Sequence, residues 1–181
     1  MDIEQIIPYL LGAVHDGTYN QKHKTTRISQ ANVDWLKILK NCLVKLGFKS
    51  WIYKEGKSRG VYVLETTAGV FKSKLNPIAL SKNAKIAYVR GYFDAEGGIP
   101  QDSGHWFYIQ ISQKNKPELE ALKSILEELG ISCGKIHVPS AKVDPDYYRF
   151  FISRKSHKDF AKVIGSWHPR KNKIFRFRMK I

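Results

Sequence analysis

The chain contains an internal duplication, and this repeat limits the folds that are open to it. Residues 10–17 (LLGAVHDG) have a counterpart in residues 89–97 (VRGYFDAEG), and each segment is followed by Ile-Ser-Gln, at 28–30 and at 111–113. Asp16 and Glu96 each stand directly before a glycine, so the duplication supplies two carboxylates at equivalent positions. We expect two folded copies to face each other across a pseudo-twofold axis, with one acid from each copy at the axis.

The charge of the chain indicates the chemistry of its partner. Its 31 Lys and Arg residues exceed its 16 Asp and Glu residues, for a net charge of +15 and a pI near 9.8. Such an excess predicts an anionic partner, and nucleic acid is the leading candidate. The membrane alternative requires a basic amphipathic helix or a long apolar run, and the sequence shows neither. The first residues also lack the basic opening of a signal peptide, which favours a soluble intracellular protein, in a prokaryotic cytoplasm or in an organelle.

The periodicity of apolar residues gives both halves the same order of elements: helix, two strands, helix, two strands, helix. We therefore expect an α+β fold of two pseudo-symmetric half-domains with antiparallel sheets, at 1–80 and 81–181, the second ending in a basic tail. Strands are expected within 18–30, 51–64, 105–113 and 133–153. Helices are expected near 6–16, 33–46, 67–75, 81–96, 116–129 and 156–165. In the tail, 168–181, aromatic and basic residues alternate, which favours a docked segment.

The two acids are expected at unfavourable positions. A carboxylate in the last turn of a helix lies against the negative end of the helix dipole, which costs about 0.3–1 kcal/mol unless a cation compensates. A divalent metal such as Mg²⁺ or Mn²⁺ would compensate both, because hard cations bind carboxylate, carbonyl and water oxygens. Gly12 and Gly91 would let the two helices approach closely. The alternative is that Asp16-Gly17 and Glu96-Gly97 are ordinary turn starters.

These residues resemble the LAGLIDADG homing endonucleases, in the single-chain form in which two motif copies make one pseudo-symmetric enzyme. Residues 89–97 fit the nine-residue motif, with Glu96 at the position of the catalytic acid. The first copy is one residue shorter between its glycines. Alignment on the final glycine matches Asp16 to Glu96, whereas alignment on the first would place Gly17 opposite Glu96. The first alignment is chosen because it keeps a carboxylate in both halves.

The resemblance implies roles for particular residues. The family's metal-binding acids correspond to Asp16 and Glu96, assisted by a main-chain carbonyl such as that of Ala95. Its active-site glutamines, at the ends of the second strands, correspond to Gln30 and Gln113. One pattern places the family's catalytic lysine directly after the glutamine, and another after the closing proline of each half. These patterns point to Lys114, or to Lys82 and Lys171, and the alternative for each is a phosphate contact or a solvated side chain.

Alternation along the second strand of each copy separates a helix-facing set from an outward set of side chains. Thr26, Ile28, Phe107, Ile109 and Ile111 would face the helices. The outward set carries hydrogen-bonding and aromatic groups that suit the major groove of DNA, and the alternative is a merely solvated face. This set comprises His23, Thr25, Arg27, Ser29, Trp106, Tyr108, Gln110 and Ser112. Basic residues of the two hairpins would add phosphate and outer-base contacts: Lys54, Lys57, Arg59, Lys135, Lys142 and Arg149.

The family's activity would be metal-assisted hydrolysis of one phosphodiester in each strand of a long, asymmetric DNA site, by a monomer. The competing class is a non-catalytic nucleic-acid-binding protein of the same fold, either a maturase that binds intron RNA or a DNA-binding regulator. Two features favour it. The first motif is short, and Ala31 stands where the second copy has Lys114.

Overall fold

The computed structural model describes residues 3–56, 58–72, 75–101 and 105–180. Of Asp16 it describes only the backbone. Each half begins with a motif helix, α1 or α3, and continues into a sheet. The first half comprises α1 (Ile3–Ala13), β1 (Gly17–Asn20), β2 (Thr25–Gln30), α2 (Val33–Lys45), β3 (Ser50–Lys54) and β4 (Tyr62–Thr66). The second comprises α3 (Lys82–Glu96), β5 (Gly97–Gly98), β6 (Gln110–Gln113), α4 (Lys116–Glu128), β7 (Tyr148–Phe151), α5 (His157–Val163) and α6 (Pro169–Met179). Short 3₁₀ turns lie at η1 (Val14–Asp16), η2 (Gly69–Lys72), η3 (Pro77–Ala79) and η4 (Arg154–Ser156).

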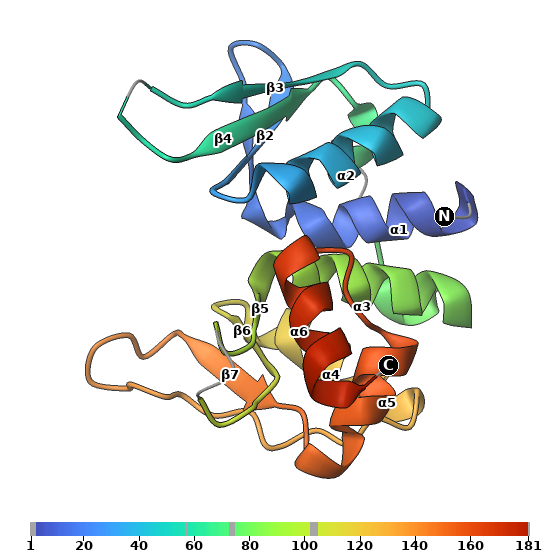
Figure 1. Cartoon of the computed structure of the whole chain (residues 1–181), viewed down its shortest axis with the longest axis vertical. Coiled ribbons are helices and arrows are strands. Elements are labelled where there is room, and N and C mark those ends of the chain that lie inside the picture. The colour runs from blue at the N-terminus through green and yellow to red at the C-terminus, as the bar shows by residue number, and fades with distance from the viewer. Residues whose placement is uncertain (1–2, 57, 73–74, 102–104, 181) are drawn as a thin grey trace.

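The halves lie one above the other, with α1 and α3 packed between them (Figure 1). The first sheet has the strand order β1-β2-β4-β3 and the second the order β5-β6-β7, and every pairing is antiparallel. The α+β architecture with two antiparallel sheets is thus confirmed. No helix in the described part of the chain has the length and apolar character needed to cross a bilayer.

Helices α2 and α4 show the repeat most clearly, because both copies use the same start and stop signals. Asn32 and Asn115 cap the two helices, their side chains accepting the backbone N–H of the third residue that follows. Such caps satisfy N–H groups that have no partner within the helix. At the other end, Gly47 and Gly130 have φ values of +78° and +80°, which glycine adopts without strain.

Each half has its own hydrophobic core between its sheet and its helices. In the first half Ile28 and Leu64 of the sheet pack against Leu36 and Leu39 of α2. In the second, β6 and β7 pack against α4 and α5 through residues such as Ile111 and Phe150. One face of each sheet is therefore buried. Thr26, Ile28, Ile109 and Ile111 are buried and Phe107 is half-buried, in agreement with the predicted helix-facing set.

The second sheet is smaller than expected. Strand β6 begins at Gln110 rather than at 105, because β5 ends after Gly98 and Pro100, which follows, has no N–H to pair. Residues 133–138 do not form a continuous strand and make only isolated bridges, Cys133 to Ile152 and His137 to Arg149.

One other local prediction was wrong. The helix expected near 67–75 is, in its described part, only the 3₁₀ turn η2. The tail is docked as expected, but as helix α6, in which Phe175 is buried whereas Phe177 is exposed.

Candidate active site and nucleic-acid interface

The two motif helices touch through their glycines. A Cβ atom on Gly12 would overlap the carbonyl oxygen of Tyr88 and lie 2.7 Å from the backbone nitrogen of Tyr92. A Cβ atom on Gly91 would overlap the carbonyl oxygen of Tyr9 and lie 2.9 Å from its carbonyl carbon. The helices therefore approach backbone to backbone, as predicted, and their C-terminal ends lie in the same part of the molecule.

The missing residue of the first motif is accommodated by a change of helix type. Helix α1 ends at Ala13 and the chain continues as the 3₁₀ turn η1, whereas α3 stays α-helical to Glu96. Three residues of 3₁₀-helix rise about 6 Å, and so do about four residues of α-helix. A segment one residue shorter thus covers the same length. Asp16 and Glu96 consequently both end their helical segments, directly before the glycine that opens the next strand.

The strands that follow preserve this equivalence. Gly17 pairs with Ile28 in the first sheet, and Gly97 pairs with Ile111 in the second. Gln30 and Gln113 each stand two residues beyond the paired isoleucine, at the last position of β2 and β6. Both are half-buried. The two predicted glutamines therefore occupy equivalent positions in the two halves, each at the end of the strand that pairs with the strand following the acid.

The lysines lie in three different surroundings. Lys82 is the first residue of α3 and Glu96 is the last, 14 positions and therefore about 21 Å further along the helix. Lys114 follows Gln113, is exposed, and pairs with Asp144 at 3.0 Å. Lys171, on α6, is buried, and its ammonium donates hydrogen bonds to the carbonyl oxygens of Phe93 and Asp94, the latter at 3.0 Å. Of the three, Lys171 contacts the end of the helix that carries Glu96.

Asp94, two residues before Glu96, holds this helix end to both halves. It is buried, and its carboxylate accepts hydrogen bonds from the hydroxyls of Tyr9 and Ser166 and from the backbone N–H groups of Trp167 and His168. Tyr9 in turn accepts a hydrogen bond of 2.9 Å from the indole N–H of Trp35 on α2. Burial raises the pKa of Asp94, and these donors oppose that effect.

A pair beside the first acid was not expected from the sequence. His15 lies 3.1 Å from Glu118, in the first turn of α4, and 4.4 Å, between ring centroids, from Tyr92. Burial lowers the pKa of His15 to about 4 and raises that of Glu118. The contact ties η1 of the first half to α4 of the second. The sequence shows an acidic residue, Glu118, near the start of α4, but it does not indicate that this residue pairs with His15, 103 positions away.

The outer face of the first sheet is organised around Glu65 on β4, which sequence analysis missed. Glu65 accepts hydrogen bonds from the hydroxyls of Thr25 and Tyr53. The Thr25 hydrogen bond is the largest cause that lowers the pKa of Glu65, with further contributions from Tyr53 and Arg27. Arg27 lies 3.3 Å from Glu55 and 3.9 Å from Glu65. Thr25 is therefore covered, whereas Arg27 is held in place and Ser29 is exposed.

The outer face of the second sheet carries a similar arrangement. Arg149 donates a 3.0 Å hydrogen bond to the side-chain oxygen of Gln110 and lies over the ring of Phe151. Tyr147 donates a hydrogen bond to Ser112 and covers it, so Ser112 is buried rather than outward-facing. Tyr108 is exposed, and Trp106 is 88% exposed on the segment before β6.

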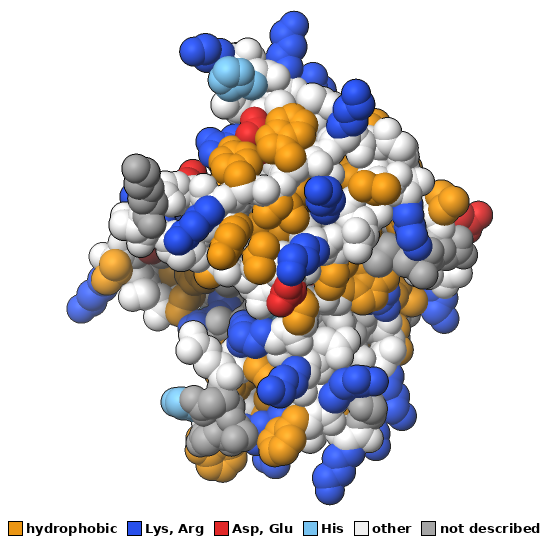
Figure 2. Space-filling model, turned by 45° about the horizontal axis from the view of Figure 1, so that its top comes forward, with side chains coloured by type: hydrophobic (Ala, Val, Ile, Leu, Met, Phe, Trp, Pro, Cys, Tyr) orange, Lys and Arg blue, Asp and Glu red, His pale blue; other side chains and the backbone are white. Residues whose placement is uncertain are grey.

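The remaining predicted contacts lie in turns and at strand ends. His23, Arg59, Lys135 and Lys142 are exposed. Lys54 is exposed at the end of β3, although its register places it on the helix-facing side, opposite Tyr62. Lys57 lies outside the described residues. Figure 2 shows Lys and Arg side chains spread over one face of the molecule, with few acidic side chains among them.

The donor atoms at the helix ends suit a hard cation. Two carboxylates and main-chain carbonyls are oxygen donors, and Mg²⁺ typically takes one or two carboxylates, with the other positions filled by phosphate and water oxygens. Among the described side chains no three His, Cys, Asp or Glu residues are grouped as metal ligands. The residues therefore fit a cation shared with a phosphate ligand better than a closed protein site.

Comparison with known proteins agrees with this geometry. Residues 83–165 match the family described as LAGLIDADG-like domain. The chain is 28% identical to homing endonuclease I-ApeI of Aeropyrum pernix over 194 residues, which cover 91% of this chain and 83% of that protein.

Solved structures show the same fold over nearly the whole chain. I-DmoI in complex with DNA and Mn has a TM-score of 0.70 at 21% identity, with 91% of this chain and 98% of that chain covered. Its complex with DNA and Ca gives 0.74 at 20% identity, with 98% and 100% covered. Full-length DUF199/WhiA from Thermatoga maritima gives 0.70 at 19% identity, covering 99% of this chain and 62% of that chain. Residues 83–165 thus match a LAGLIDADG-like domain, and the chain as a whole, with its two glycine-packed motif helices in one polypeptide, has the fold of I-DmoI.

Proposed function

We propose that this protein is a site-specific DNA endonuclease, a homing endonuclease that makes a metal-dependent double-strand break in a long asymmetric site. The observation that carries the proposal is the juxtaposition of two equivalent helix ends, each closing on an acid, in a chain of net charge +15. Two acids related by pseudo-symmetry match two strands of a duplex. The relatives named as homing endonucleases, and the I-DmoI structures that contain DNA with Mn or Ca, support the same function.

In this proposal the outer faces of the two sheets lie in the major groove. Arg27 is oriented by Glu55 and Glu65 and suits guanine, and Gln110, oriented by Arg149, suits adenine. The exposed basic residues of the turns contact phosphates. These contacts set the position of the backbone relative to the helix ends, and the base contacts set the sequence.

At the helix ends, Asp16, Glu96 and the carbonyl of Ala95 would hold the divalent cation. When bound, the cation would activate a water molecule and stabilise the leaving oxygen. Gln30 and Gln113 would orient water by hydrogen bonding, one for each strand. Lys114 would offset charge on the phosphate. Lys171 acts on the position of Glu96, since it neutralises the negative end of α3 from inside the protein.

The cleavage assay requires a target, which selection from a randomised duplex library in Mg²⁺ would provide. The wild-type protein is expected to cut both strands of the selected duplex. Glu96→Gln should abolish cleavage of at least one strand while preserving affinity, because the acid contributes to chemistry rather than to phosphate contacts. Lys135→Gln should preserve cleavage at saturating protein and reduce the slope of log affinity against log salt by about 0.9. Unchanged cleavage by Glu96→Gln would refute the proposal.

A non-catalytic nucleic-acid-binding role is the second candidate. The first motif reaches its acid through a 3₁₀ turn, and Ala31 offers no cation beside Gln30. The fold also occurs in WhiA, whose name denotes no nuclease. This candidate predicts sequence-selective duplex or intron-RNA binding without cleavage in Mg²⁺ or Mn²⁺, in the same selection experiment.

A further inference from the structure

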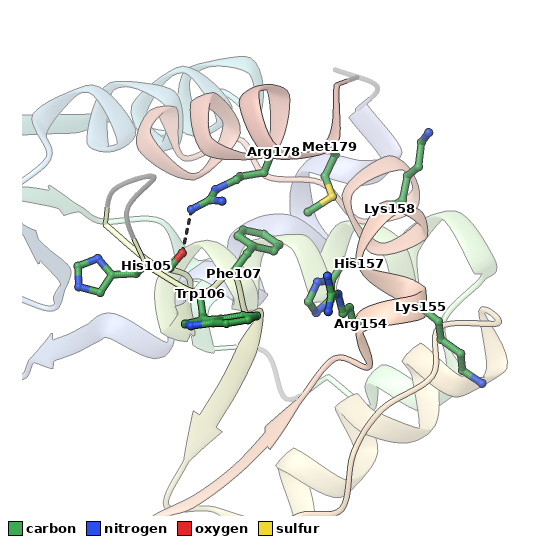
Figure 3. A pocket seen from close by; sticks show the side chains of 9 residues that line it. All are labelled: His105, Trp106, Phe107, Arg154, Lys155, His157, Lys158, Arg178 and Met179. Atoms are coloured by element: carbon green, nitrogen blue, oxygen red, sulfur yellow. Dashed lines mark hydrogen bonds between the residues drawn. The ribbon is translucent and has the colours of Figure 1, made fainter.

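A basic cavity lies in the second half, between the segment before β6, the start of α5 and the end of α6. Its volume is about 610 Å³, and it is lined by His105, Trp106, Phe107, Arg154, Lys155, His157, Lys158, Arg178 and Met179 (Figure 3). Pockets that hold small organic ligands have volumes of about 300–1,000 Å³. The cavity therefore has room for one or two nucleotides.

The charge of the cavity selects an anion. Four of its lining residues are Lys or Arg and two are His, and none of the described lining residues is acidic. Arg154, Lys155 and Lys158 are exposed at its mouth, and in Figure 3 the two lysines point outward, away from the aromatic side chains. Such an arrangement attracts phosphate groups from solution.

The inner wall of the cavity is fixed by contacts within the protein. Arg178 donates a 2.9 Å hydrogen bond to the carbonyl oxygen of His105 and lies over the ring of Phe107. Phe107 packs edge to face with His157, which is itself hydrogen-bonded to the carbonyl of Ile152. Because these contacts join α6, α5 and the segment before β6, the cavity is formed before any ligand binds.

Trp106 specifies the kind of anion. Its side chain is 88% exposed on the rim of a cationic cavity. A base-paired duplex keeps its base faces stacked on one another, so it cannot offer one to the indole. An unpaired base can stack there, an interaction typically worth about 1–3 kcal/mol.

The cavity is also displaced from the candidate active site. Strand β6 runs from Gln110 to Gln113, and Gln113 marks the end near the helix ends. The segment containing Trp106 precedes the opposite end of the strand. A duplex on the sheets and a separate strand in the cavity would therefore occupy different surfaces.

We propose that this cavity is a second nucleic-acid site, which binds one or two unpaired nucleotides of a single strand. The cationic side chains hold the phosphates, and Trp106 stacks on one base. The site lies beyond the proposed endonuclease function and does not require it. Single-stranded DNA and RNA both offer phosphates and unpaired bases, so binding measurements with each decide which strand the cavity prefers.

The test is fluorescence anisotropy of dye-labelled DNA and RNA single strands of about ten nucleotides, with the full-length protein. Trp106→Ala should weaken binding of the preferred strand about fivefold to 150-fold, and Trp106→Phe, which keeps a stacking ring, should restore most of it. Phe177→Ala is the matched control, because Phe177 is an exposed aromatic residue outside the cavity. It should leave the affinity unchanged.

The cations have their own variant pair. Arg154→Gln with Lys155→Gln should lower the salt slope of single-strand binding by about 0.7 for each phosphate that is no longer neutralised, whereas the exposed Lys173→Gln should not. The Arg154→Gln, Lys155→Gln variant should bind a duplex as the wild type does. The proposal is overturned if Trp106→Ala binds the single strands with wild-type affinity or if the wild-type protein binds neither DNA nor RNA single strands. It is also overturned if the duplex affinity of the Arg154→Gln, Lys155→Gln variant falls in parallel with its single-strand affinity. None of these binding measurements depends on cleavage, so an absence of cleavage activity would be a separate result.

Discussion

Gly91→Ala is expected to disrupt the contact on which the paired helix ends depend. The new Cβ atom would lie 2.9 Å from the carbonyl carbon of Tyr9 and 3.0 Å from the nitrogen of Ala13, and would overlap the Tyr9 oxygen. Carbon atoms in favourable contact are about 3.5–4.0 Å apart, so α1 and α3 must separate by roughly 1 Å. Both neighbours are backbone atoms, and no change of side-chain rotamer can relieve the overlap.

The expected loss of stability follows from two opposing effects. Overpacking of this kind costs about 1–3 kcal/mol, and the site favours the upper end of that range. Alanine regains about 0.8–1 kcal/mol through its higher helix propensity. The free energy of unfolding should therefore fall by about 2 kcal/mol, and Tm by about 4–8 °C for a chain of this length.

Cleavage should fall further than stability explains, because separation of the helices moves one acid relative to the other. A displacement of about 1 Å can cost on the order of 100-fold in rate. Unfolding in urea and cleavage of a selected duplex measure the two effects. Gly69→Ala is the matched control, since nothing lies within 4 Å of its Cβ position, and it should change stability by less than about 0.5 kcal/mol. Wild-type stability and cleavage in Gly91→Ala would refute the close-packing argument.

Three further predictions concern buried or paired side chains. Lys171→Met should lower the urea midpoint by an amount equivalent to about 1–3 kcal/mol, because it removes the donor to two buried carbonyls; native stability without cleavage would instead show direct binding of Lys171 to DNA. Burial lowers the pKa of His168 to about 4 from 6.5, so its protonation favours the unfolded chain. The stability difference between the wild type and His168→Gln should shrink by up to about 3 kcal/mol as the pH falls from 6.5 to 4, and a constant difference in the unfolding titrations would contradict this. Glu65→Gln should relax the base preference opposite Arg27, by about 1–3 kcal/mol in a duplex selection, and an unchanged preference would show that Glu65 does not orient Arg27.

The sequence was sufficient to predict the duplicated architecture, because the signals that define it are local. The periodicity of apolar residues and the alternation along strands depend on neighbouring residues, and both patterns occur in each copy. The close approach at Gly12 and Gly91 was also predictable, because a glycine in each motif copy leaves room for the backbone of the other helix. What could not be predicted was how the shorter motif keeps its acid at the helix end, since that depends on a change from α-helix to 3₁₀-helix in η1.

The site was less predictable where side chains from distant positions meet. Glu65 covers Thr25, and Tyr147 covers Ser112, so two residues assigned to the outer face by alternation are buried. Alternation gives the side of the sheet on which a residue lies but not what lies over it. Lys171 was selected by its place in a repeat, yet its partners are carbonyls of α3, which only the packing of α6 brings within reach.

The claim that the acids of the two helix ends hydrolyse the two DNA strands is tested most directly by strand-resolved cleavage. The selected duplex, labelled on each strand, would be incubated in Mg²⁺ with wild-type protein, Asp16→Asn, Glu96→Gln and the double variant. The account predicts cleavage of both strands by the wild type, loss of cleavage of at least one strand in each single variant, and none in the double variant, all at undiminished DNA affinity. Cleavage of both strands by the double variant at the wild-type rate would contradict it.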